Sequence, residues 1–233
     1  MPVADTVSCG IAVIAWVCQH PRLMRLGGAM DADVEALLRA LATRNAPLHW
    51  AEATVLVNRD AFARARDAGL LRHILQDTVL TQAGRAAVGA ADYAAHDPVT
   101  WPAESRERLY LSGYCHVLAL ALHDLSGFPI VLLRDRRMKG RDGAAGVLHV
   151  FVEAPDSCCY DIDGLTSRAR MLADTKAKSP VFQAIARDEL AAFVGEYGHL
   201  VRYDEEDVTC ARGVAVSLGL LGSHAPSLAE VRR

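Results

Sequence analysis

Hydrophobic residues recur at helical spacing along the first ninety positions of the chain. The segment DADVEALLRALATRN, at 31–45, carries acidic residues in its first turn, and either Asp31 or Asp33 is a suitable N-cap. Two shorter helical patterns follow, HWAEATVLVN at 49–58 and RDAFARARDAGLLRHI at 59–74. The apolar positions of the first pattern, spaced as i, i+3, i+4 and i+7, are Val34, Leu37, Leu38 and Leu41.

In the second half of the chain the pattern changes to one apolar helix and several strands. The segment YLSGYCHVLALALHDLSGFP, at 110–129, predicts a helix from about Gly113 to Leu125. Ser112 is placed to cap this helix, and Gly127 is placed to end it. Strands are predicted for FPIVLLR at 128–134, GVLHVFVEA at 146–154 and CCYDIDG at 158–164, and helical spacing returns at 179–198 and 204–222.

This mixture of helices and strands predicts an α+β fold in two domains. The segment AADYAAHDPVTWPAE, at 90–104, has two prolines and little periodicity. We therefore place a boundary there, between a helical module at 1–97 and a second domain at 98–233. The apolar stretch at 6–18 lacks a preceding basic region and is shorter than the ~20 residues of a membrane span, so we interpret it as a core helix or strand.

Composition and charge exclude several classes of protein. Hydrophobic residues make up 52% of the chain, charged residues 23%, and the net charge is −3, as in soluble globular proteins. Neither domain has the basic excess of a nucleic-acid binder. The six cysteines form no CxxC pair and no zinc-type spacing with histidine, and they are too sparse for a disulfide scaffold. A reducing compartment and no metal site follow from this pattern.

The helices of the first module, a short strand around GLL at 69–71 and the segment LTQAGRAAV at 80–88 resemble a winged-helix domain. The resemblance covers residues 31–90 and implies DNA binding through the third helix and the wing. The third-helix stretch, at 58–72, contains two aspartates among its basic residues, whereas phosphate neutralisation requires a positive face. We therefore expect a structural or protein-interaction role for this module in preference to DNA contact.

Cys115 falls in the first turn of the helix expected at 113–125. Unpaired backbone N–H groups and the positive end of the helix dipole stabilise a thiolate at that place, and they lower a cysteine pKa below its free value of ~8.5. Two of the strands that follow carry His149 and Asp161. The chain therefore presents a cysteine, a histidine and an aspartate on successive elements.

That order, written SGYCHVLALAL…LHVFVEA…CYDIDG, resembles the papain-like and transglutaminase-like cysteine enzymes over residues 108–167. The resemblance implies a helix-and-antiparallel-sheet domain with Cys115 as nucleophile, His149 as general base and Asp161 as the orienting carboxylate. In such enzymes a thiolate attacks a carbonyl, an imidazole moves the proton, and a carboxylate fixes the imidazole tautomer. The spacing of His149 and Asp161 suits a hairpin that brings both side chains onto one face.

Three further residues are alternates or supporting groups for this site. Asp163 has the same strand parity as Asp161, so it could lie on the same face and is an alternative for the orienting carboxylate. His116 adjoins Cys115, but adjacent helical side chains point about 100° apart, so we expect a surface or core histidine. Tyr110 is expected to help the backbone N–H groups bind an oxyanion, since the segment 106–114 lacks the Gln that papain-like proteases place before the nucleophile.

The sequence thus predicts a cysteine-nucleophile acyl-transfer enzyme of the peptidase, isopeptidase, glutamine deamidase or transglutaminase type. A protein or peptide amide is the expected substrate, and neither a cofactor nor membrane association is expected. The alternative is a DNA-binding or protein-interaction regulator with a catalytically inactive papain-like domain. A cytoplasmic location and translocation as an effector are both compatible with the sequence.

Overall fold

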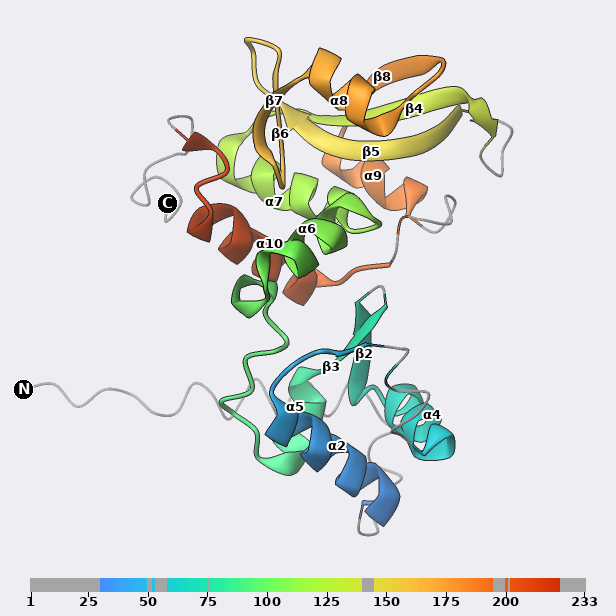
Figure 1. Ribbon diagram of the computed structural model, residues 1–233, viewed down its shortest axis with the longest axis vertical. Helices are drawn as coiled ribbons and strands as arrows, with labels where there is room; N and C mark the ends of the chain where they lie inside the picture. The colour runs from blue at the N-terminus through green and yellow to red at the C-terminus, as the bar shows by residue number, and fades with distance from the viewer. Residues whose placement is uncertain are drawn as a thin grey trace, which may run out of the picture. The chain divides into compact units, whose positions relative to one another are not determined.

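The protein folds into two compact units, Met1–His96 and Asp97–Arg233 (Figure 1). The computed structural model describes residues 30–49, 52, 58–74, 76–139, 145–194, 200 and 202–222. Both units combine helices with antiparallel strands, which confirms the α+β class. The apolar stretch at 6–18 lies outside the described residues. Within those residues, no helix has both the length and the apolar character that crossing a membrane requires.

Helix α2, Ala32–Arg44, opens the first unit where the sequence predicts it. Asp31 is its N-cap, because Oδ1 of Asp31 accepts hydrogen bonds from the backbone N–H of Asp33 at 3.0 Å and of Val34 at 3.2 Å. The apolar stripe of the helix packs into the core of this unit. Its residues, all buried, are Val34, Leu37, Leu38 and Leu41.

The rest of the first unit is a small antiparallel sheet with two more helices. Its strands have the order β1-β3-β2, and α2 contacts α4, α5 and β3. His49, expected to begin a helix over 49–58, pairs with Asp77 in a strand instead, and most of that segment lies outside the described residues. The elements after α2 are β1 Leu48–His49, α4 Arg59–Asp67, β2 Leu71–Ile74, β3 Asp77–Leu80 and α5 Gln82–Val88.

Helix α4 lies within the third-helix stretch of the winged-helix resemblance, and two of its arginines are paired with carboxylates. Arg64 lies 3.3 Å from Asp31, and Arg66 lies 2.9 Å from Asp67. These ion pairs reduce the positive charge that α4 presents to a phosphate backbone.

The second unit contains a five-stranded antiparallel sheet with the order β7-β6-β5-β4-β8. Strands β4 and β5 form its long central hairpin, and β6 and β7 form a shorter hairpin at one edge (Figure 1). The elements are the 3-10 helix Pro98–Thr100, α6 Ala103–Leu111, α7 Cys115–Ser126, β4 Ile130–Lys139, β5 Ala145–Glu153, β6 Cys158–Asp161, β7 Gly164–Ser167, α8 Arg168–Thr175, β8 Pro180–Ile185, α9 Arg187–Phe193 and α10 Glu205–Ser217.

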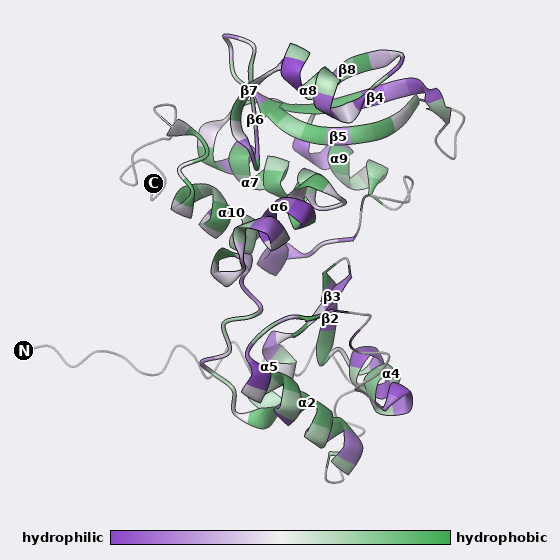
Figure 2. Ribbon diagram, viewed as in Figure 1, coloured by the Kyte–Doolittle hydropathy of each residue, from purple (hydrophilic) through white to green (hydrophobic). Residues whose placement is uncertain are grey.

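Helix α7 lies in the middle of this unit, between the sheet and α10 (Figure 1). It contacts β5 and β6 on one side and α10 on the other, so the first eight residues of the helix, 115–122, are all buried. This two-sided burial explains the continuous apolar run in the sequence, and Figure 2 shows α7 and β5 as mainly hydrophobic ribbon.

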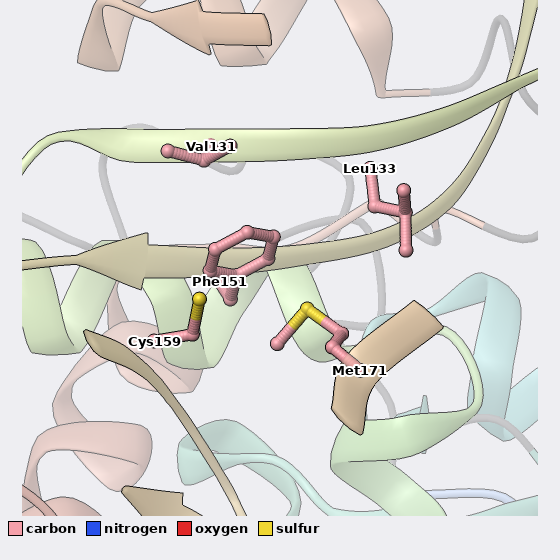
Figure 3. Close-up of a cluster of buried hydrophobic side chains, with 5 residues drawn as sticks. All are labelled: Val131, Leu133, Phe151, Cys159 and Met171. Carbon is pink, nitrogen blue, oxygen red and sulfur yellow. The ribbon is translucent and has the colours of Figure 1, made fainter. Parts of the chain in front are cut away.

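A second group of buried side chains lies on the sheet under α8 (Figure 3). Met171 comes from α8 and packs against residues of three strands, which fixes α8 over this part of the sheet. The cluster consists of Val131, Leu133, Phe151, Cys159 and Met171.

Three expectations for the second unit are wrong in detail. Ser112 does not cap α7: it is the C-cap of the preceding helix α6, and the N-cap of α7 is Tyr114. The sequence pattern did not predict α6. The segment 180–185 is strand β8 and not helix, because it pairs with β4 along its whole length. The segment read as a loop up to residue 104 contains a 3-10 helix and the start of α6.

Candidate functional site

Cys115 is the first residue of α7, and the turn before it is built around a glycine. Gly113 has φ 130°, a left-handed conformation that favours glycine, and it separates the end of α6 from the start of α7. The first residues of a helix have no intrahelical acceptor for their N–H groups, so the thiol lies at the positive end of the dipole. The side chain is almost fully buried, with 3% of the residue exposed.

His149 and Asp161 come from neighbouring strands of one hairpin. Strands β5 and β6 pair Val152 with Tyr160 and Glu153 with Cys159. Continued along the strands, this register makes Asp161 a diagonal neighbour of His149 on the same face, within reach of a long side chain. The predicted hairpin therefore does bring the two residues together.

The His149 imidazole is held by a buried hydrogen bond to Asp161. Its Nε2 donates to Oδ2 of Asp161 at 2.9 Å, and Oδ1 of the same carboxylate accepts from the backbone N–H of Asp163 at 2.9 Å. The residues are 4% and 7% exposed. With Nε2 engaged in this way, Nδ1 is the nitrogen available to Cys115.

The electrostatics of Cys115 and His149 favour a charged pair. Burial raises the pKa of the Cys115 thiol, but side-chain hydrogen bonds with His116 and His149 and the charges of these histidines lower it more, to about 6. Burial lowers the pKa of His149, whereas hydrogen bonds with Asp161 and Cys115 and their negative charges raise it, to about 10. Between these values the thiolate and imidazolium forms predominate.

His116, the residue after Cys115, is buried in the interior of the second unit. It is 0% exposed, and its ring packs edge-on against Tyr203 with centroids 5.3 Å apart. Its burial fits the core histidine that the sequence predicts, and its charge is one of the causes that lower the pKa of the neighbouring Cys115 thiol.

Asp163 was the alternative to Asp161 as the orienting carboxylate, and Tyr110 was expected to help bind an oxyanion. Asp163 is exposed in the turn after β6, where burial and the charges of Asp161, Glu107 and Asp174 raise its pKa. Tyr110 is buried, and its charged neighbours include Cys210 and Asp207 of α10. The hydrogen bond to the imidazole comes from Asp161.

Backbone N–H groups at the start of α7 differ in their availability to a ligand. The N–H of Tyr114 donates to the carbonyl of Leu109 at 3.2 Å and is used within the turn. The N–H of Cys115 points out of the helix N-terminus and has no intrahelical carbonyl to bind. This group is the natural donor to an oxyanion formed on an acyl group at the sulfur.

A cleft of about 450 Å³ opens beside the His149–Asp161 pair. Its walls come from the C-terminal end of α6, from β5 to β7, and from α8, which the sequence reading did not associate with the site. The residues after Ser167 form the short helix α8, and the place of this helix beside the cleft depends on tertiary packing. The cleft is lined by Leu111, Leu148, His149, Asp161, Asp163, Thr166, Arg170, Met171, Asp174 and Thr175.

The other described cysteines differ from Cys115. Burial and the negative charge of Glu153 raise the pKa of Cys159 to about 12, and a hydrogen bond with Asp156 raises the pKa of Cys158. In the part of the chain that the structure describes, Cys115, Cys158 and Cys159 are free thiols, and no group of three His, Cys, Asp or Glu side chains is arranged to hold a metal ion.

Comparison with known proteins gives no match to this chain among protein-family models, curated proteins or solved structures.

Proposed function

We propose that the second unit is a cysteine acyl-transfer enzyme that acts on an amide of a protein or peptide. Cys115 is the nucleophile, His149 the general base and acid, and Asp161 the residue that orients the imidazole. The proposal depends on one observation: Nε2 of His149 is held by a buried 2.9 Å hydrogen bond to Oδ2 of Asp161, and this imidazole lowers the pKa of a thiol at a helix N-terminus. The pKa of the thiol, about 6, supports a thiolate at neutral pH.

The chemistry follows from these positions. The Cys115 thiolate attacks the amide carbon, forming a C–S bond, while the backbone N–H of Cys115 stabilises the oxyanion. As the C–N bond breaks, the His149 imidazolium gives its proton to the leaving amine or ammonia, and a thioester remains. Water or an acceptor amine then attacks the thioester, passes its proton to His149, and releases the acyl product and the thiolate.

Asp161 has a positioning and electrostatic role in both steps. Its carboxylate holds the imidazole by Nε2, which leaves Nδ1 for proton transfer with the thiol, and it stabilises the imidazolium while the thiolate is present. The peptidase, isopeptidase, deamidase and transglutaminase reactions share these steps and differ only in the leaving group and in the final acceptor.

An activated acetyl ester tests the proposal without knowledge of the natural substrate. After reaction of the full chain with p-nitrophenyl acetate, peptide mass spectrometry should locate an acetyl group on Cys115. The Cys115→Ala and His149→Gln variants should lose that adduct. Acetylation spread over Cys158 and Cys210, or unchanged in His149→Gln, would contradict the proposed nucleophile.

A further inference from the structure

The edge of the sheet nearest the site is the short, partly exposed strand β7. Strand β7 ends the sheet order, and among the described strands only β6 pairs with it. Its sequence, GLTS at 164–167, contains neither proline nor a charged residue, the features with which edge strands usually resist pairing. The residues of β7 are alternately half-buried and exposed, and Leu165 is 63% exposed.

Two clefts flank this strand and meet at the turn that precedes it. Beside the cleft at His149 and Asp161, a second cleft of about 610 Å³ lies between α6, the β6–β7 hairpin and the residues after α10. Asp163 lines both clefts, so the two adjoin at the hairpin turn. A chain that lies along β7 therefore passes beside the cleft that His149 and Asp161 line.

The walls of the two clefts carry a surplus of negative charge. Five carboxylates line them, from Glu107, Asp156, Asp161, Asp163 and Asp174, against two guanidinium groups, from Arg106 and Arg170. Asp161 is engaged with His149, and Arg170 lies 3.2 Å from Asp174. Outside these two pairs, the walls still hold more carboxylates than guanidinium groups, which favours a cationic ligand.

Exposed apolar side chains accompany these carboxylates. Leu165 and Leu218 line the second cleft, and Leu111, 43% exposed, lines the cleft at His149. An extended polypeptide that adds to β7 presents its side chains alternately to the two faces of the sheet. The cleft walls there carry both carboxylates and leucines, so a peptide that contains both basic and apolar residues is complementary to them.

We propose that the free edge of β7 binds an extended, basic and apolar segment of a polypeptide substrate by strand addition and leads it into the cleft at His149. This inference deepens the proposed function and rests on it. Main-chain hydrogen bonds to β7 supply affinity for any extended chain, and the carboxylates and leucines select its side chains.

Binding is measured on the full chain carrying Cys115→Ala, so that no turnover occurs and the outcome is independent of catalysis. The probe is a fluorescent peptide of alternating Lys and Val, and the matched probe replaces each Lys by Glu. Fluorescence anisotropy at low salt should show the Lys peptide binding at least about tenfold more tightly. Hydrogen exchange should show amides of 164–167 protected only when that peptide is present.

Two surface variants separate β7 from other exposed apolar positions. Leu165→Arg should weaken the Lys peptide by about tenfold, because it adds a like charge at the edge strand. Met138→Arg, at a residue 46% exposed on β4 and outside both clefts, should leave its binding unchanged.

Equal binding of the two peptides, no binding of either, or no effect of Leu165→Arg would overturn the proposal. Self-association of the peptide-free chain that Leu165→Arg abolishes would also overturn it, since a second copy would then occupy the edge. None of these results bears on acetylation of Cys115, so the triad and the edge strand can fail separately.

Discussion

The Nε2 atom of His149 donates a hydrogen bond to Oδ2 of Asp161 at 2.9 Å, in a part of the second unit where both residues are more than nine-tenths buried. A buried imidazolium without its carboxylate is costly, because desolvation opposes the charge. The carboxylate therefore controls both the orientation and the protonation of the imidazole that contacts Cys115.

Replacing Asp161 by Asn should lower the pKa of His149 from about 10, because the hydrogen bond and the negative charge that raise it are removed. NMR titration of the imidazole resonances measures this change. Asp163→Asn is the matched control: Asp163 lies in the same turn but contacts Asp161 only through its backbone N–H, so its removal should shift the His149 pKa much less. Equal shifts in the two variants would refute the assignment of Asp161.

Turnover should depend on pH through both members of the charged pair. The thiolate forms as pH rises through about 6, so the rate should increase there, and the imidazolium that protonates the leaving group is lost as pH rises through about 10, so the rate should fall there. Steady-state hydrolysis of an amide substrate over this range gives the profile. A rate that only begins to rise near the free cysteine pKa of ~8.5 would be incompatible with the pair.

The glycine before α7 should matter for the thiol. Gly113→Ala forces a side chain into φ 130°, at a cost of about 1–3 kcal/mol, and displaces the start of the helix that carries Cys115. We expect slower alkylation of Cys115 together with a lower unfolding temperature. Gly127→Ala, at φ 72° on the other end of α7, is the control: it should lower the unfolding temperature while thiol reactivity stays at the wild-type level.

Phe151 connects the core under α8 to the site, since its ring stacks on the His149 ring with centroids 6.3 Å apart and an interplanar angle of 18°. Phe151→Ala should destabilise the second unit by about 3–5 kcal/mol, through lost burial and the cavity left behind. Phe151→Leu should cost clearly less, because it retains most of the side-chain volume. Calorimetric unfolding of the full chain measures both. Similar losses for the two variants would show that the cavity is not the cause.

Features that depend on local periodicity were predictable from the sequence. The spacing of apolar residues and the acidic cap predict α2 correctly, because local propensity and tertiary burial agree there. The alternation around His149 and the following turn likewise predict the hairpin that joins His149 to Asp161.

Features that depend on distant contacts were not predictable from the sequence. Strand β8 has apolar residues at spacings that also suit a helix, and its pairing with β4, some fifty residues earlier, decides its conformation. The full burial of His116 and the place of α8 over the cleft likewise result from packing of the whole unit. The preference for Asp161 over Asp163 came from the resemblance to cysteine enzymes, and the 2.9 Å contact depends on where β6 ends.

The measurement that tests the central claim most directly is the pH dependence of iodoacetamide alkylation at Cys115, mapped by peptide mass spectrometry in the wild type and in His149→Ala. In the wild type, alkylation should rise with a midpoint near pH 6, while Cys158 in the same sample, whose pKa is raised, should react only at alkaline pH. In His149→Ala the midpoint for Cys115 should move upward, because burial continues to raise the thiol pKa and one imidazole is gone. A Cys115 that reacts only after unfolding, or that titrates like Cys158 in both proteins, would contradict an activated thiolate and make Cys115 a packing residue.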